Sequence, residues 1–237
     1  MSIKQLSESG NEAMTERALS ALSRRKFLSY VGMGSALVVG ASALASCDKD
    51  DDAPSGGVNL GSGDVGILNY AYALEQLEAA FYTRVMMSPF STMTPTETAF
   101  LTDIRDHEIA HRNFFKAAIS AAGATPLQDL EVDFSTINFA DRTSVLGTAK
   151  VFEDLGVMAY NGAGKLITNP VYLVIAGQIV SVEARHAALI ADLISNGTFS
   201  NTTDVNGLDT AMTPAQVLAA ADPFIVTKIN ASNLPTS

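Results

Sequence analysis

Two short strings with the same spacing most restrict how this chain can fold. Glu108-Ile109-Ala110-His111 and Glu183-Ala184-Arg185-His186 each place a glutamate three residues before a histidine, and both lie within long apolar stretches. The two strings use two of the three histidines in the sequence. On an α-helix, residues three apart share one face, so each string directs a carboxylate and an imidazole towards one point. Each string therefore predicts half of a metal site.

The apolar pattern predicts four long helices and one short helix. Apolar residues recur at three- and four-residue spacing, as in helices that bury one face, over residues 65–87, 94–122, 141–165 and 169–195. The second helix has a clear start, because Thr94 and Glu97 form a capping box around Pro95. The short helix begins at Thr213-Pro214 and ends near residue 222.

An internal repeat groups the four helices into two hairpins. Glu75 and Tyr82 stand seven residues apart in the first helix, and Glu153 and Tyr160 do so in the third. Each of these glutamates precedes a Glu-x-x-His string, by 33 and 30 residues. Residues 124–139 form a long link, which we interpret as a crossover loop, and the tail from residue 227 is expected to be loose. The prediction is an all-α four-helix bundle with one long crossover and a short C-terminal helix.

Acidic residues dominate the chain, but few of them are glutamates. After Cys47 the formal charge is −12, with 10 basic and 22 acidic residues, which excludes nucleic acid as an expected partner. Only seven glutamates follow Cys47, and five stand in apolar helical stretches, namely Glu75, Glu78, Glu108, Glu153 and Glu183. Carboxylates avoid such positions unless they are paired or bind metal. The charge of −4 on four ionised carboxylates would balance the charge of two divalent cations. A metal-ligand set of carboxylates and imidazoles without thiolates suits iron or manganese better than zinc.

The N-terminal part reads as an export signal. Arg24 and Arg25 precede a moderately apolar run, residues 28–44, which ends in Leu44-Ala45-Ser46-Cys47. This order is typical of a twin-arginine signal peptide followed by a lipobox, with Cys47 as the lipidated residue. An uncleaved membrane anchor is the alternative. We expect a membrane-anchored lipoprotein, periplasmic or on the outer surface.

These patterns together divide the chain into four parts. A signal peptide with lipobox covers residues 1–46, and an acidic flexible tether that starts at the lipidated cysteine covers 47–63. The helical bundle covers residues 64–196. A C-terminal loop with a short helix and tail covers 197–237.

The ligand order resembles that of the ferritin-like superfamily of di-iron and di-manganese proteins. The order is Glu, Glu-x-x-His, Glu, Glu-x-x-His, carried by Glu75, Glu108, His111, Glu153, Glu183 and His186. Leu68-Asn69-Tyr70-Ala71 is similar to the exported, desiccation-related branch. The resemblance implies a ferritin-like four-helix bundle with two metal ions bound by these six residues.

Several neighbouring residues keep more than one interpretation. Glu78 also lies on the inner face of the first helix and could contact a metal ligand without binding the metal itself. The seven-residue spacing to tyrosine, which recurs in the third helix, favours Glu75 over Glu78 as the ligand. Tyr82 and Tyr160 fit either hydrogen bonding to the ligands or simple packing. His107 fits a surface histidine or one that contacts a ligand. Glu108 and Glu153 are both placed to bridge two ions, although spacing does not show which carboxylates bridge, and Gly156 leaves the most room for a small oxidant.

Function divides into two main hypotheses. The first is a redox enzyme that acts on O₂ or peroxide, as a peroxidase, catalase or ferroxidase would, with a role in oxidative or desiccation stress. The second is a lipid-anchored stress protein that binds metal without turnover or serves a structural purpose. A lipid anchor on every subunit fits poorly with a closed storage cage, although it leaves room for a smaller oligomer.

Overall fold

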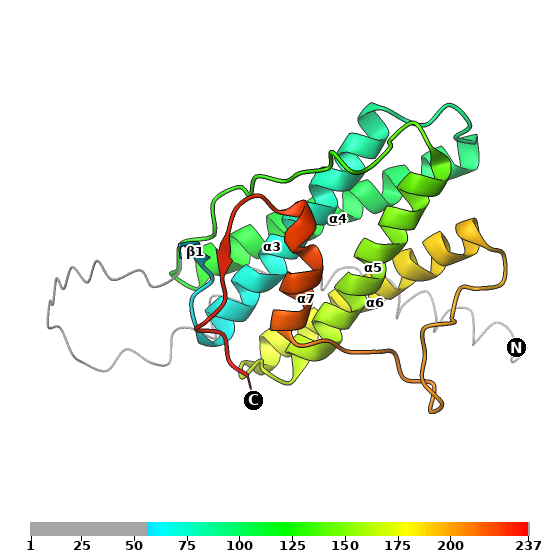
Figure 1. The fold of residues 1–237 in the computed structure, drawn as a ribbon. Coiled ribbons are helices and arrows are strands. Elements are labelled where there is room, and N and C mark those ends of the chain that lie inside the picture. Colours follow the sequence, from blue (N-terminus) through cyan, green and yellow to red (C-terminus); the bar gives the residue numbers. More distant parts are fainter. Residues whose placement is uncertain (1–55, 237) are drawn as a thin grey trace, which may run out of the picture.

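The computed structural model describes residues 56–236 (Figure 1). The predictions for Arg24, Arg25 and Cys47 lie outside the described residues. Within them the fold is all-α, as predicted, and is built on four long helices: α3 (Gly63–Met87), α4 (Pro95–Ala121), α5 (Arg142–Gly164) and α6 (Pro170–Ile194). Two shorter helices follow, α7 (Pro214–Ala221) and the 3₁₀ helix η1 (Asp222–Phe224).

Side-chain caps explain where the helices begin. The Thr94 hydroxyl accepts a hydrogen bond from the Glu97 backbone N–H, while the Glu97 carboxylate accepts one from the Thr94 N–H at 2.8 Å. This is the predicted capping box, and it satisfies donors that a helix start would otherwise leave unpaired. Glu97 also accepts a hydrogen bond from Nε of Arg142 at 2.6 Å, and another Arg142 nitrogen donates to the Leu193 carbonyl. Arg142 thereby ties the starts of α4 and α5 to the end of α6.

The two hairpins of the internal repeat are visible in the structure. Helix α3 packs along α4, and α5 packs along α6. The connection between the hairpins runs along the length of the bundle (Figure 1) and contains no strand, apart from one isolated bridge between Val132 and Ile225. Two buried amides of α3 hold it in place, since Asn69 accepts from the Leu127 N–H and Gln76 accepts from the Leu130 N–H. The expected crossover loop is confirmed.

Both edges of the domain differ from the sequence prediction. Strand β1 (Val58–Asn59) pairs in parallel with β2 (Ile229–Asn230), and Leu60 and Leu234 are buried. The tail from residue 227 is therefore packed rather than loose, and the folded domain begins at about residue 58 instead of 64. The two strands are only two residues long and far apart in sequence, so no local alternation pattern indicates them.

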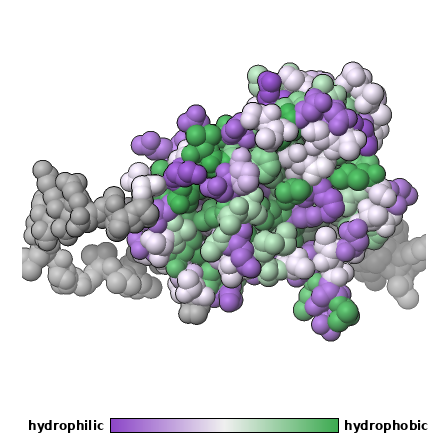
Figure 2. Space-filling view, viewed as in Figure 1, coloured by the Kyte–Doolittle hydropathy of each residue, from purple (hydrophilic) through white to green (hydrophobic). Residues whose placement is uncertain are grey.

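Helix α6 is the most apolar of the long helices. Within residues 56–236 it is the one helix whose length and composition would allow it to cross a membrane. Its Glu183 and His186 are buried and the helix packs along α5, but only 28% of its most apolar window is buried and Leu173, Val174 and Ile194 are exposed. On the face seen in Figure 2, hydrophilic and hydrophobic residues are intermixed.

Two glycines of α5 give a matched stability test. A Cβ on Gly162 would lie 1.7 Å from the backbone carbonyl oxygen of Met212, whereas a Cβ on Gly147 would meet no atom within 4 Å. We expect Gly162→Ala to lower the free energy of unfolding by about 1–3 kcal/mol, because the backbone of the C-terminal segment must move. Gly147→Ala should raise it by about 0.5–1 kcal/mol, as alanine is the better helix former. Urea unfolding of both variants measures this, and equal effects would contradict the described packing.

Candidate metal centre

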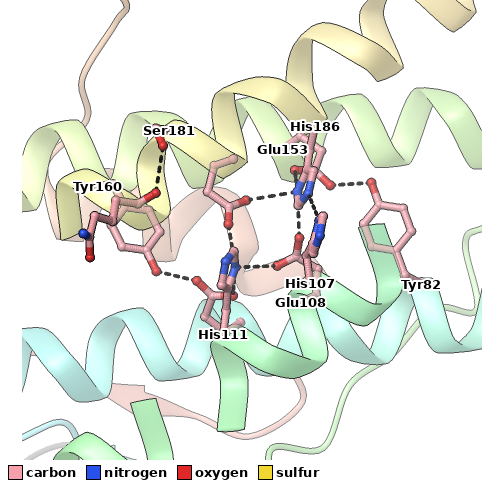
Figure 3. A network of polar contacts seen from close by, with 11 residues as sticks. Tyr82, His107, Glu108, His111, Glu153, Tyr160, Ser181 and His186 are labelled. Atoms are coloured by element: carbon pink, nitrogen blue, oxygen red, sulfur yellow. Dashed lines mark hydrogen bonds and ion pairs between the residues drawn. The ribbon is translucent and has the colours of Figure 1, made fainter. Parts of the chain in front are cut away.

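The six predicted ligand residues meet in the middle of the bundle. Helices α3 and α5 contribute one glutamate each, while α4 and α6 each contribute a Glu-x-x-His string, so that every long helix supplies a carboxylate (Figure 3). The four carboxylates are almost completely buried, and His111 is the most exposed member at 13% of its side chain. The residues are Glu75, Glu108, His111, Glu153, Glu183 and His186.

Each histidine directs its Nδ1 atom at three carboxylates. His111 Nδ1 lies 2.9 Å from Glu183, 3.4 Å from Glu75 and 3.5 Å from Glu108. His186 Nδ1 lies 2.8 Å from Glu108, 3.4 Å from Glu153 and 3.8 Å from Glu183. Two groups of four donors result, and in each group the donor atoms lie within 4.8 Å of one another.

The two groups share Glu108 and Glu183. Glu108 directs Oε2 at His111 and Oε1 at His186, and Glu183 directs Oε1 at His111 and Oε2 at His186. A carboxylate that offers one oxygen to each group is positioned to bridge two ions. Glu153 belongs to one group only, whereas Glu183 belongs to both, so the geometry favours Glu108 and Glu183, rather than Glu153, as the carboxylates that could bridge. Both shared glutamates belong to the Glu-x-x-His strings of α4 and α6. Helices α3 and α5 supply the terminal carboxylates, which are those that belong to one group only.

Both tyrosines of the repeat contact the cluster. The Tyr82 hydroxyl donates to Glu153 Oε1 at 2.5 Å, and the Tyr160 hydroxyl donates to Glu75 Oε1. Each tyrosine lies on the helix of the opposite hairpin from its glutamate, so the two bonds cross the bundle symmetrically. The hydrogen-bonding interpretation of these residues is correct. Such a bond fixes the terminal carboxylate and leaves its second oxygen free.

Eight side-chain atoms that point at the centre make no hydrogen bond outside the cluster and contact only one another, while the Tyr70 hydroxyl, outside both groups, is a further buried atom without a partner. The eight atoms comprise both oxygens of the two shared glutamates, one oxygen of each terminal glutamate and the Nδ1 atom of both histidines: Glu108 Oε1 and Oε2, Glu183 Oε1 and Oε2, Glu75 Oε2, Glu153 Oε2, His111 Nδ1 and His186 Nδ1. Buried polar atoms are normally paired. Eight converging atoms without partners outside the cluster fit a pair of metal ions, and a carboxylate-rich set with imidazoles suits iron or manganese.

Burial of so many carboxylates shifts their proton affinities. Burial raises the pKa of Glu108 to about 8, with a contribution from the charge of Glu183, and raises the pKa of Glu153 to about 7. Burial acts in the same direction on Glu183, but hydrogen bonds from both histidines outweigh it and lower that pKa to about 2. Burial would lower the pKa of His186, yet the neighbouring carboxylates raise it to about 12. Without metal, the cluster therefore retains protons to balance its charge.

His107 contacts His186, which agrees with the interpretation of His107 as a histidine that contacts a ligand. Its Nδ1 lies 2.9 Å from His186 Nε2, and the two rings stack with an interplanar angle of 11°. With His186 bound to metal through Nδ1, its Nε2 would carry the ring proton and donate to His107 Nδ1, which would fix the ring. His107 itself is exposed. Sequence periodicity alone could not identify the contact, because it depends on how α4 and α6 cross.

Glu78 lies deeper than a solvated edge position. It is 4% exposed, and its Oε1 would be 3.1 Å from a Cβ built on Gly156. The space that Gly156 leaves in α5 is thus occupied by the Glu78 carboxyl. The expectation of open room for an oxidant at Gly156 is wrong, and a bulky residue there would first displace Glu78.

The proton affinities predict how the metal-free protein responds to pH. Burial raises the pKa of the Glu108 and Glu153 carboxyls from the ordinary value of 4.5 to about 8 and about 7 in the metal-free fold. Between pH 5 and 8 the folded state then binds more protons than the unfolded state, so stability falls as pH rises. We expect the melting temperature in chelator to drop by about 5 °C or more over this range.

Manganese should oppose this trend, because metal replaces the protons, and its stabilising effect should grow with pH. Glu108→Gln, which removes one titrating group, should show a smaller drop in chelator. Thermal unfolding in chelator and in manganese at several pH values measures both effects. A melting temperature in chelator that rises between pH 5 and 8 would contradict the described cluster.

Comparison with known proteins gives one match. The sequence model of the family described as "Ferritin-like domain" matches residues 63–196, which span α3 to α6 and include all six converging residues. No curated protein matches the chain. Because the match covers more than half of the sequence and its bounds coincide with the bundle, the chain belongs to the ferritin-like domain family.

Proposed function

We propose that this protein binds two iron or manganese ions in its bundle and uses them in redox chemistry with O₂ or peroxide. The observation that carries the proposal is the set of eight buried ligand atoms that have no hydrogen-bond partner outside the cluster, arranged as two groups that share Glu108 and Glu183. The ligands are Glu75, Glu108, His111, Glu153, Glu183 and His186. Two divalent ions would balance the four carboxylates, which supports iron or manganese over a metal-free core.

Redox chemistry is supported by the coordination that the protein leaves open. Each group offers four donor residues, fewer than the six positions of an octahedral ion. Bound iron or manganese would supply the electrons for reduction of the oxidant. Tyr82 and Tyr160 hold the terminal carboxylates through hydrogen bonds, and the near-complete burial of the glutamates keeps bulk water out.

An apolar cavity of about 30 Å³ lies beside Tyr160 and is lined by residues of α3, α4, α5 and α6. A dry cavity of this kind can admit a small apolar molecule. It lies on the side of the cluster where Tyr160 contacts Glu75, which favours O₂ as the oxidant that approaches there.

The alternative is a stress protein that binds metal without turnover. The carboxyl of Glu78 in the space beside Gly156 favours it, because that group closes one approach to the cluster. The two functions differ in turnover but share the metal site, so the same preparation separates them.

The metal assignment predicts two ions per chain. We expect wild-type protein, purified and dialysed against iron or manganese, to retain two ions, and the double variant His111→Ala/His186→Ala to lose at least one. The holo melting temperature of the double variant should fall, since metal stabilises only the folded state. His107→Ala is the matched control, because that residue contacts a ligand but is no ligand, and it should retain both ions. Elemental analysis decides, and two ions in the double variant would refute the assignment.

The same proteins decide between the two functions. An oxygen electrode and a peroxide assay, each with and without reductant, should show consumption by the loaded wild type and at least a tenfold loss in the double variant. Wild-type protein that holds two ions but consumes neither oxidant would support the non-catalytic alternative.

We further propose that the protein is exported through the twin-arginine pathway and anchored to the membrane by lipid on Cys47. Lysine in place of Arg24 and Arg25 should abolish export, whereas Cys47→Ser should leave export intact and remove the lipid. Cell fractionation and mass spectrometry of the mature N-terminus measure both outcomes. A mature protein that begins at a residue other than Cys47 would refute the lipid anchor.

A further inference from the structure

The internal repeat is broken on the outer face of α6. This face is made of the exposed residues Leu173, Val174, Gly177, Gln178, Ser181, Ala184 and Arg185. The two Glu-x-x-His strings align α4 with α6, so each residue of α4 has its equivalent 75 positions later. Asp103 and Asp106 are exposed on α4, and the residues in their place on α6 are the uncharged Gln178 and Ser181. Among the exposed residues of α6, Arg185 is the only charged one.

Two large apolar side chains protrude near the start of this face. Leu173 and Val174 are 46% and 62% exposed. Their equivalents on α4 are Thr98 and Ala99, a polar and a small residue. A surface helix normally directs its large apolar side chains to the core and its polar ones to solvent. The outer face of α6 thus has the composition of a contact surface.

A hollow lies at the other end of the same face. Its volume is about 200 Å³, and it is bounded by α5, α6 and residues 199–203, which belong to the segment that follows α6 (orange in Figure 1). Phe199 of that segment is 64% exposed. The floor is formed by small residues of α6, namely Ala184, Ala187, Ala188 and Ala191. Along the helix, the hollow and the protruding pair are about 20 Å apart.

Protrusion and hollow complement each other in an antiparallel pair of α6 helices. With a twofold axis beside Ser181, Val174 of one copy faces Ala188 of the other. Twofold symmetry makes the same contact twice, since both copies use the same patch. Arg185 then lies opposite Gln178 of the other copy, whose amide oxygen is an acceptor for the guanidinium. Small residues in the middle of the face let the two helices approach closely.

Charge also favours this face for self-association. Residues 56–236 contain 18 acidic and 9 basic residues, a formal charge of −9. Two copies therefore repel each other over most of their surfaces. The outer face of α6 has no exposed carboxylate, and its one charge, on Arg185, has a neutral acceptor opposite it.

We propose that the protein forms a twofold dimer through the outer face of α6, in which Leu173 and Val174 of each copy enter the alanine-floored hollow of the other. Burial of these side chains and of Phe199 supplies the apolar core of the interface. The inference goes beyond the proposed function and requires neither bound metal nor lipid.

The test measures oligomeric state by analytical ultracentrifugation of the full chain with Cys47→Ser, which has no lipidation site. We expect a dimer, with or without chelator. Val174→Asp places an unpaired carboxylate in both apolar contacts and should raise the dimer dissociation constant about tenfold or more. The matched control is Ala99→Asp, because Ala99 is exposed at the equivalent position of α4. It adds the same charge and should leave the dimer unchanged.

A charge pair tests the register of the two helices. Ala188→Lys places a cation in the hollow and should weaken the dimer as Val174→Asp does. The double variant Val174→Asp/Ala188→Lys should recover the dimer, because the new carboxylate of each copy faces the new ammonium of the other. Both positions are outside the core, so the melting temperature of the monomer should change little.

Three results would overturn the inference. They are a wild type that stays monomeric at every concentration, a Val174→Asp variant that dimerises as tightly as wild type, and a double variant that recovers nothing. Vesicles of phosphatidylethanolamine and phosphatidylglycerol examine a different occupant. Monomeric wild type that binds these vesicles, with binding lost in Val174→Asp, would assign the face to a lipid surface instead.

Discussion

The electrostatic cost of burying carboxylates organises this structure. Glu75, Glu108, Glu153 and Glu183 lie at the centre of a bundle whose core is otherwise mostly apolar, and each is at most 1% exposed. Such groups can share a core only if protons or cations compensate their charge. The tyrosines that fix the terminal glutamates, the histidines between the carboxylates and the glycine that admits Glu78 are all arranged around that requirement. Bound metal would supply the compensation and leave the carboxylates ionised.

The sequence was most informative where the chemistry is local. A Glu-x-x-His string on an apolar helix fixes the relative position of two donors by helix geometry alone, and its repetition gave the six converging residues and the hairpin order. Capping signals such as Thr94 with Glu97 located helix starts to within a residue or two. These features depend on neighbours within one turn, so the one-dimensional pattern contains them.

Features that depend on how helices cross could not be predicted. The membership of Glu183, rather than Glu153, in both donor groups and the contact of His107 with His186 both follow from the relative rotation of α4, α5 and α6. The pairing of β1 with β2 joins segments about 170 residues apart, and no local pattern indicates such pairs. The position of Glu78 required knowledge of which residue of α5 faces it.

The broken symmetry of the two hairpins makes the two halves of the centre chemically different. One half has His186, whose ring rests on the exposed His107, and the other has His111, with Tyr160 and the apolar cavity behind Glu75. If both donor groups bind metal, as proposed, their unequal surroundings give them unequal intrinsic affinities, so loading should be sequential, with one ion in place before the other. Sequential loading also opens a route to mixed centres, in which the first site takes one element and the second takes another according to supply.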